Sequence, residues 1–305
     1  MTGVMSRVDA PAEVRMVPYT FLRMFGSQPQ VVSAAPGGLR LLADPVADLA
    51  VAVPWGAVVA GTARDDGVLE LRSRNRPAEG VRLGPDEWTA GTAPNWARPA
   101  IRAAVRLRNA GFRIGGATLV VHTGLPESLS IPTAAGTAAA TIRAFTELYH
   151  LSGTTRVAAD AAELAALTAR AGEAILRRAD ATVEHLPCDL AAAGLRLLVV
   201  EPGDPAAVTT RRPVVAAGTV ARAADALRAG DLAGFGRLLT TGEPHPAVTA
   251  ANAAGALGAA ARPVLCVLLH VADLTRVRVA VRAALPNGTY RPRFLTATPA
   301  AAETR

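Results

Sequence analysis

Apolar and polar positions in the first part of the chain follow patterns typical of β-strands. Residues 37–44 and 49–63 are apolar runs of strand type, interrupted at Pro45 and Pro54. Asp66-Gly67 stands between two alternating runs, which is a signal for a β-hairpin. This part of the chain is therefore expected to build a sheet.

Helical spacing becomes common toward the middle of the chain. Apolar residues three and four apart predict helices over 98–111, over 134–149 and over 157–180, the last as one long helix or a helix pair. A further helical region at 215–242 divides into two at Gly230-Asp231. The remaining pattern predicts strands at 117–123, 194–204, 263–273 and 290–300, and a helix at 275–285.

This order of elements predicts an α+β protein of two lobes. Strands with a helix come first, and helices with strands follow. We place the N-terminal lobe at residues 1–155 and the C-terminal lobe at residues 156–305. The chain has 305 residues, half of them hydrophobic, which is enough for a sizeable core in each lobe.

The charge balance restricts the chemistry. All 32 basic residues are Arg, so no Lys can form a Schiff base or serve as a phosphate-loop cation. The net charge is +7 and the sequence pI is about 10.7, but the Arg residues are scattered and aromatic residues are only 4%. We interpret this as a solvated surface that favours small anions, and we expect no binding of nucleic acid.

Cysteine and histidine usage points to no metal or cofactor. Cys188 and Cys266 lie in apolar settings without CxxC spacing, which predicts buried thiols in a reducing cytoplasm. No two His residues have metal-ligand spacing. The longest apolar run, at 263–272, is too short to span a bilayer, and the N-terminus has no signal-peptide core. The expected location is cytoplasmic, away from the membrane.

The segment 125–137, "LPESLSIPTAAGT", carries the clearest candidate chemistry. It joins a predicted strand to a predicted helix, an arrangement that often holds phosphate. The start of a helix presents N–H groups that have no partner within the helix, so this one can hold a single anion. Side chains that could add to such a site are Glu127, Ser128, Ser130 and Thr133.

Four segments in the same order resemble galactokinase and its relatives in the GHMP kinase superfamily. The opening contains Ala35-Pro36-Gly37, similar to the family's APGR start, and a strand and hairpin follow. The other segments are "GFRIGGATLVVHTGLP", "RAADALRAGDLAGFGRLL" and "YRPRFLTATPAAA". The resemblance implies a two-lobe fold in which ATP and substrate meet in a central cleft.

The same resemblance indicates that the family's catalytic motifs are lost. Gly38 stands at the Arg position of the APGR start. The family's phosphate loop, of the type LPxGAGLSSSAA, has Ser128 and Ser130 here in place of two glycines, although such loops need glycine for close backbone approach. The family's catalytic Asp lies in a segment like GIMDQ, which is missing between residues 171 and 200.

The resemblance implies candidate site residues in the segment that contacts the sugar in the family. Asp44 stands at an acidic position and Asp48 follows it, so both are candidate catalytic carboxylates. Asp44 precedes Pro45, so turn formation is the alternative interpretation. Arg40 could bind an anion in the cleft, or be a solvated strand residue. The three Trp residues are interpreted as packing or cleft-wall residues.

These features favour a repurposed GHMP-fold protein of a bacterial biosynthetic pathway. It would bind an anionic small metabolite and promote a step other than phosphorylation, such as displacement or elimination of a sulfate or phosphate. One alternative is a non-catalytic subunit that scaffolds or activates a partner, either another protein or a second copy. The other is a divergent small-molecule kinase.

Overall fold

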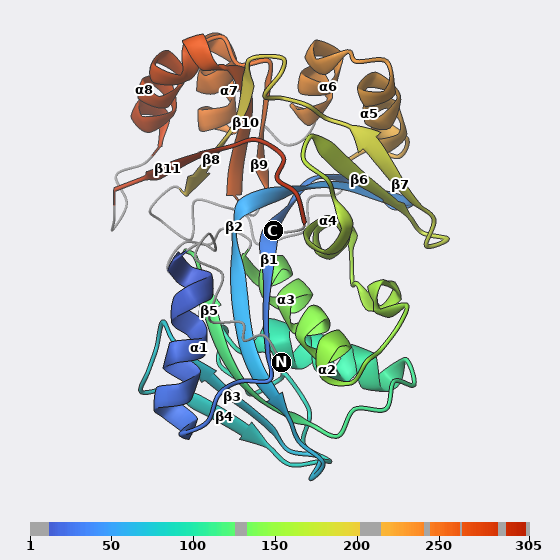
Figure 1. Cartoon of the computed structure of the whole chain (residues 1–305). Coiled ribbons are helices and arrows are strands. Elements are labelled where there is room, and N and C mark those ends of the chain that lie inside the picture. Colours follow the sequence, from blue (N-terminus) through green and yellow to red (C-terminus); the bar gives the residue numbers. More distant parts are fainter. Residues whose placement is uncertain are drawn as a thin grey trace.

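The structure is a computed structural model that describes residues 12–125, 133–201, 215–240, 245–262, 264–285 and 291–302. Its larger sheet has seven strands in the order β4-β3-β5-β2-β6-β7, with β1 paired to β2 (Figure 1). Their bounds are β1 (Val31–Ala43), β2 (Ala47–Ala63), β3 (Leu69–Ser73), β4 (Gly80–Leu83), β5 (Ala117–Thr123), β6 (Glu173–Arg178) and β7 (Val183–Pro187).

The long strand β2 organises this sheet. One edge of β2 pairs with β1, while the other edge pairs with β6 over 47–51 and with β5 over 57–63. Pro54 was expected to interrupt the strand, yet β2 runs through it. Pro54 lies between the two stretches, where neither β5 nor β6 pairs with β2, so the missing N–H removes no bond to those strands.

The predicted hairpin at Asp66-Gly67 is wrong. The chain does turn there, and Gly67 has a φ of 73°. However, β3 does not return along β2, because β5 lies between them and pairs parallel to β3. A local turn signal carries no information about a strand that enters the sheet later in the sequence.

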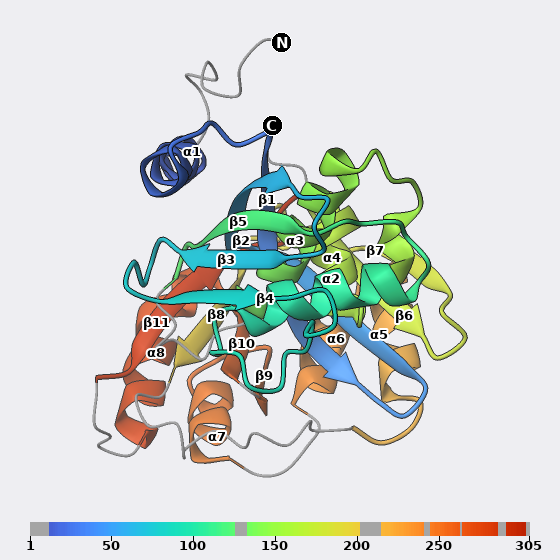
Figure 2. The same cartoon turned by 90° about the horizontal axis from the view of Figure 1, so that it is seen from below.

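Helices cover both faces of this sheet. α1 (Ala12–Phe25) packs on one side through Val17 and Phe21, against strands β2 and β5. The main core lies on the other side, under α2 (Arg98–Asn109), α3 (Thr133–Leu148) and α4 (Ala161–Thr168). Seen from below, α1 stands apart from α2 and α3 across the strands (Figure 2).

A second sheet of four strands forms the upper part of the molecule in Figure 1. Its order is β11-β8-β10-β9, with β8 (Leu195–Glu201), β9 (Gly258–Arg262), β10 (Val264–His270) and β11 (Arg293–Ala297). One face packs on α5 (Thr219–Arg228) and α6 (Leu232–Leu239), the other on α7 (Pro246–Ala253) and α8 (Leu274–Ala284). The break predicted at Gly230-Asp231 separates α5 from α6, as expected.

The helix or helix pair predicted over 157–180 is mostly wrong. Helix α4 covers only 161–168 of it, and residues 173–178 form β6 instead. Gly172, with a φ of 75°, directly precedes that strand. The break between the two sheets falls between β7 and β8, later than the lobe boundary predicted after residue 155, which stays a prediction.

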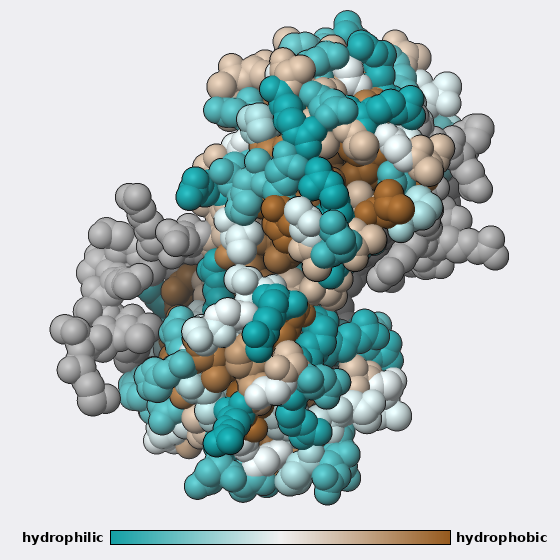
Figure 3. Space-filling model, turned by 90° about the vertical axis from the view of Figure 1, so that its right-hand side faces the viewer, coloured by the Kyte–Doolittle hydropathy of each residue, from teal (hydrophilic) through white to brown (hydrophobic). Residues whose placement is uncertain are grey.

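One apolar core joins the two sheets. It combines β1 and β2 residues such as Leu41 and Val51 with β8 and β10 residues such as Val199 and Leu268. Helices α5 and α6 add Leu227 and further residues to the same core. Hydrophobic surface is also visible between the upper and lower parts of the molecule on the face drawn in Figure 3.

Candidate functional site

The Ala35-Pro36-Gly37 segment lies in β1, directly under two helices. A Cβ atom at Gly38 would overlap the backbone oxygen of Ala162 in α4, with 2.6 Å to the Ala162 carbonyl carbon. It would also lie 2.9 Å from Cβ of Ala135 in α3. Backbone contacts this close leave no room for a side chain, so Gly38 is required by the packing of α3 and α4 on β1.

Two predicted site residues meet at the N-terminus of α4. Nε of Arg40 lies 3.7 Å from Oδ2 of Asp48, and the Arg40 guanidinium also pairs with Asp160. Asp160 caps α4 by accepting a hydrogen bond from the amide of Glu163, and Asp48 accepts one from Ala161 at 2.9 Å. Arg40 and Asp48 therefore anchor the first turn of this helix to the sheet.

Burial raises the pKa of two carboxyl groups at this helix start, Asp48 and Glu163. It raises the pKa of Asp48, while the amide of Ala161 and the charge of Arg40 act in the opposite direction. Burial likewise raises the pKa of Glu163, although Arg106 donates to its carboxylate at 2.5 Å. Nε of Arg40 is buried and donates no hydrogen bond to any of the described residues.

Asp44 lies apart from that cluster, at the turn between β1 and β2. Asp44 is 8% exposed. Oδ1 accepts hydrogen bonds from the amides of Val46 and Ala47 at 3.0 and 2.9 Å. Oδ2 accepts from the amides of Gly218 and Val220 at 3.2 and 3.3 Å. The carboxylate thus ties this turn to the start of α5, and an Asp44 base would have to give up some of these bonds.

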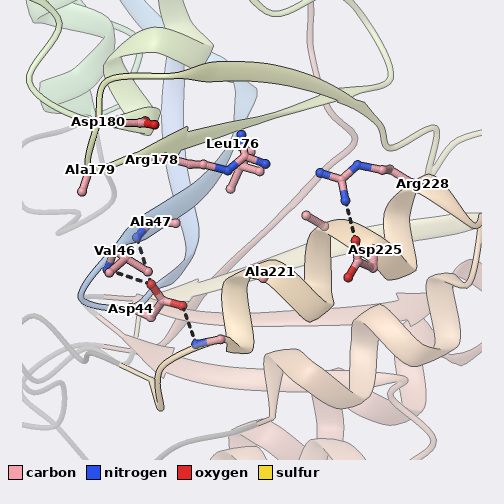
Figure 4. A pocket seen from close by; sticks show the side chains of 12 residues that line it. Asp44, Val46, Ala47, Leu176, Arg178, Ala179, Asp180, Ala221, Asp225 and Arg228 are labelled. Atoms are coloured by element: carbon pink, nitrogen blue, oxygen red, sulfur yellow. Dashed lines mark hydrogen bonds and ion pairs between the residues drawn. The ribbon is translucent and has the colours of Figure 1, made fainter.

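Asp44 also lines a cavity of about 460 Å³ between the larger sheet and α5. The walls come from the β1–β2 turn, the β6–β7 hairpin and α5 (Figure 4). Arg178 and Arg228 point toward each other from opposite walls. Both donate to Glu184, and hydrogen bonds from Arg228 and Arg178 lower the pKa of Glu184 to about 2. Both guanidinium groups are therefore engaged by Glu184, and Arg228 links the hairpin to α5.

A second cavity, of about 340 Å³, adjoins the Ala35-Pro36 segment. It is lined from α1, β1, β2, the end of β5 and the C-terminal segment, and it includes Trp55 and His122. Trp55 therefore lines a cavity, while Trp88 and Trp96 are buried, as the interpretation of the tryptophans expected.

The predicted anion loop is only partly within the described residues. Glu127, Ser128 and Ser130 lie outside them. Thr133 is the first residue of α3, and its carbonyl accepts a hydrogen bond from Thr137 at 3.0 Å. A Cβ atom at Gly136 would lie 2.7 Å from the carbonyl oxygen of Pro36, so the first turn of α3 touches the APG segment.

Sequence reasoning missed Asp160 and Glu163, which complete the cluster around Arg40 and Asp48. The signal was present, since Asp160-x-x-Glu163 is a helix-start pattern. It was hidden within the long helix predicted over 157–180. Sequence reasoning also missed the pairing of Glu184 with α5, which joins segments far apart in the chain and leaves no local signal.

The structure also locates both cysteines. Cys188 and Cys266 are both buried, and burial raises the pKa of Cys188 to about 12. In the parts of the chain that the structure describes, no three His, Cys, Asp or Glu side chains are grouped to hold a metal. Within the same residues, no helix combines the length and apolar character needed to cross a membrane.

Comparison with known sequences gives one curated relative. The chain is 28% identical to galactokinase from Streptomyces coelicolor over 203 residues, which cover 59% of this chain and 52% of that enzyme. The chain therefore spans about half the length of this curated relative. No protein-family model matches it.

Comparison with solved structures confirms the predicted fold. Galactokinase from Lactococcus lactis, in complex with galactose, aligns with a TM-score of 0.74 at 16% identity, over 93% of this chain and 97% of that one. Mevalonate kinase from Methanococcus jannaschii gives 0.57 at 12% identity, over 88% and 98%. Mevalonate diphosphate decarboxylase from Staphylococcus aureus gives 0.58 at 11% identity, over 88% and 96%. The chain therefore has the predicted α+β fold of the GHMP kinases, and part of its sequence is similar to that of a galactokinase.

Proposed function

We propose that this protein binds a small anionic metabolite at the start of α3 and promotes a step other than phosphoryl transfer from ATP. One concrete version is displacement or elimination of a sulfate or phosphate that the substrate already carries. The leaving anion would be held by Ser128, Ser130, Thr133 and the first N–H groups of the helix. The S. aureus decarboxylase named above has the same fold, so proteins with this fold include one that is not named a kinase.

The packing at Gly38 is the observation that carries this proposal. By resemblance, the family places an Arg here, at the end of its APGR start. In this chain the backbone of Ala162 occupies the space that any side chain at position 38 would need. A cation needed near a transferring phosphoryl group therefore cannot come from this position.

Two further observations support the proposal. The carboxylate of Asp44 is engaged by backbone amides, which leaves it poorly placed to recognise a sugar hydroxyl. The chain has no Lys to replace the missing Arg near the phosphate loop. Asp44 and Asp48 stay predictions as catalytic carboxylates.

Anion binding can be measured directly by titrating the whole chain with inorganic phosphate or sulfate in a calorimeter. We expect Ser130→Ala to weaken phosphate binding about three- to tenfold, the worth of one lost hydrogen bond. Ser152→Ala, at an exposed bend remote from the loop, is the matched control and should bind as the parent does. Equal affinity in all three proteins would remove Ser130 from the site.

A galactokinase-like sugar kinase is the second candidate function. The 28% identity to the S. coelicolor galactokinase favours it. Release of ADP from Mg²⁺-ATP, with galactose and other small alcohols as acceptors, separates the two. Our proposal expects no acceptor-dependent ADP release and no thermal shift with millimolar nucleotide. Acceptor-dependent ADP release would establish the kinase instead.

A further inference from the structure

The cavity of about 340 Å³ beside the Ala35-Pro36 segment is lined mainly by apolar side chains. It lies within the size range of small-molecule sites. Of the described residues that line it, His122 and Trp55 carry polar atoms in their side chains, and Nδ1 of His122 lies 3.0 Å from Oδ1 of Asn75. The main side-chain walls are Pro36, Pro54, Trp55, Val14 and Val58.

Some backbone polar groups around this cavity already have hydrogen-bond partners. The carbonyl of Ala34 accepts a hydrogen bond from Arg143 at 2.9 Å. The amide of Gly124 donates to the carbonyl of Gly56 at 2.9 Å, and the amide of Ala300 donates to Ala52 at 2.9 Å. A ligand in the cavity therefore meets mainly apolar side chains, among them the indole of Trp55.

Such walls select against a sugar. Each sugar hydroxyl that entered would lose hydrogen bonds to water and find few side-chain partners, which is unfavourable. An aromatic or other apolar ring loses nothing of that kind, and it can pack against Trp55 and the two prolines. The chemistry of the walls thus favours an apolar ring.

The cavity also adjoins the start of α3. A Cβ atom at Gly136, in the first turn of that helix, would lie 2.7 Å from the carbonyl oxygen of Pro36 and 3.2 Å from Cα of Gly56. Pro36 and Gly56 both line the cavity. A ligand held by its anionic group at this helix start can therefore reach the cavity with a neighbouring ring.

We propose that the cavity lined by Pro36, Trp55 and Val58 binds an apolar ring of the protein's small-molecule ligand. The ligand is then an anion with a ring-bearing body, such as an aryl or cycloalkyl phosphate or sulfate, rather than a polyhydroxylated sugar. The position of its anionic group rests on the proposed function, whereas the ring site rests on the cavity alone.

Three probes test this by calorimetry on the full chain: methylphosphonate, benzylphosphonate and benzyl alcohol. The ring in benzylphosphonate should increase affinity at least about tenfold over methylphosphonate, from the apolar surface it buries. Benzyl alcohol should bind weakly without the anion. Equal affinity for the two phosphonates, with no binding of benzyl alcohol, would overturn the ring site.

Variants at the cavity wall locate the effect. Ala301→Leu should fill the space and abolish the advantage of benzylphosphonate over methylphosphonate, and Trp55→Ala should reduce it severalfold. Ala229→Leu, at the exposed end of α5, is the matched control and should keep the full advantage. A melting temperature for each variant establishes that it is folded. An advantage that persists in both folded cavity variants would place the ring elsewhere.

Failure of the anion site is distinguishable from failure of the ring site. The ring site would stand and the anion site would be rejected by the following result. Benzyl alcohol binds and loses this binding in Ala301→Leu, benzylphosphonate binds no more tightly than benzyl alcohol, and methylphosphonate does not bind. Methylphosphonate binding with no gain from the ring would do the reverse.

Discussion

At the scale of single residues, close backbone packing explains why glycine stands at three positions around Pro36. Gly38 has α4 against it, and Gly56 has Ala35 and Pro36 against it. Gly136 in turn touches Pro36. These glycines let β1, β2 and α3 approach with no side chains between them, so the segment around Pro36 is a tightly packed junction.

Substituting Gly38 should destabilise the protein strongly. In Gly38→Ala the new Cβ would meet the backbone of Ala162, which cannot move without shifting α4. We expect a loss of more than about 2 kcal/mol in the free energy of unfolding, measured by urea denaturation. Gly91→Ala, where a Cβ would have ordinary contact with Thr89, is the control and should change stability little.

Asp44→Asn tests whether Asp44 acts through structure. An Asn keeps one acceptor oxygen, but its side-chain NH2 is a donor and would face backbone N–H donors. We expect a loss of about 1–3 kcal/mol in unfolding free energy, since amides of the β1–β2 turn or of α5 lose their acceptor. Asp86→Asn, at an exposed loop, should be neutral. Unchanged stability with lost ligand turnover would instead support a catalytic role for Asp44.

At the scale of elements, the β6–β7 hairpin is held to α5 by one carboxylate. Glu184 accepts two hydrogen bonds from Arg228, at 2.8 and 2.9 Å, and one from Arg178 at 2.9 Å. The three side chains are one-third to two-fifths exposed, so solvent screens the interaction. The carboxylate nevertheless connects two elements that border the larger cavity.

Glu184→Gln should weaken this connection in a pH-dependent way. The folded pKa of Glu184 is lowered from 4.5 to about 2. A lowered carboxyl pKa gives stability that is present above the unfolded value and is lost as pH falls toward 2. At pH 7 we expect a loss of about 1 kcal/mol or less in urea unfolding.

The difference between Glu184→Gln and the parent should narrow as pH falls from 5 to 2, and it should shrink in high salt. The exposed Asp65→Asn removes a charge away from this pair and is the control. A difference that stays constant over this pH range would show that the ion pair contributes nothing.

Elements with local signals were predictable, and those set by distant partners were not. The helices over 98–111 and 134–149 correspond to α2 and α3, because helical periodicity lies within the segment itself. Strand β6 was taken for helix, because its pairing with β2 and β7 is not visible locally. In the same way, Arg40 and Asp48 were chosen from the sequence, but their shared position at the start of α4 emerged only from the fold.

At the scale of the whole molecule, the two sheets share one core. Strand β2 belongs to the larger sheet, yet Leu49 and Val51 pack in the same cluster as Leu197 and Leu268 of the smaller one. Separating the sheets would expose this apolar surface to water, which is unfavourable. The sheets are therefore coupled by packing as well as by the chain.

We expect the whole chain to unfold in one cooperative transition. All three Trp residues lie in the first 100 residues, so their fluorescence reports on the larger sheet. Far-ultraviolet circular dichroism reports on both sheets. Their midpoints in urea should coincide, and calorimetry should give one peak. Two separate transitions would mean that the shared core does not couple the sheets.

The reactivity of the buried thiols reports on opening of this shared core. Cys188 and Cys266 come from opposite sides of the junction between the sheets, and both belong to the core that joins them. With the pKa of Cys188 near 12, almost no thiolate is present in the closed protein at neutral pH. Reaction with a thiol reagent must then wait for the core to open. The rate of labelling, with and without a ligand, therefore measures how often the junction separates, without any engineered probe.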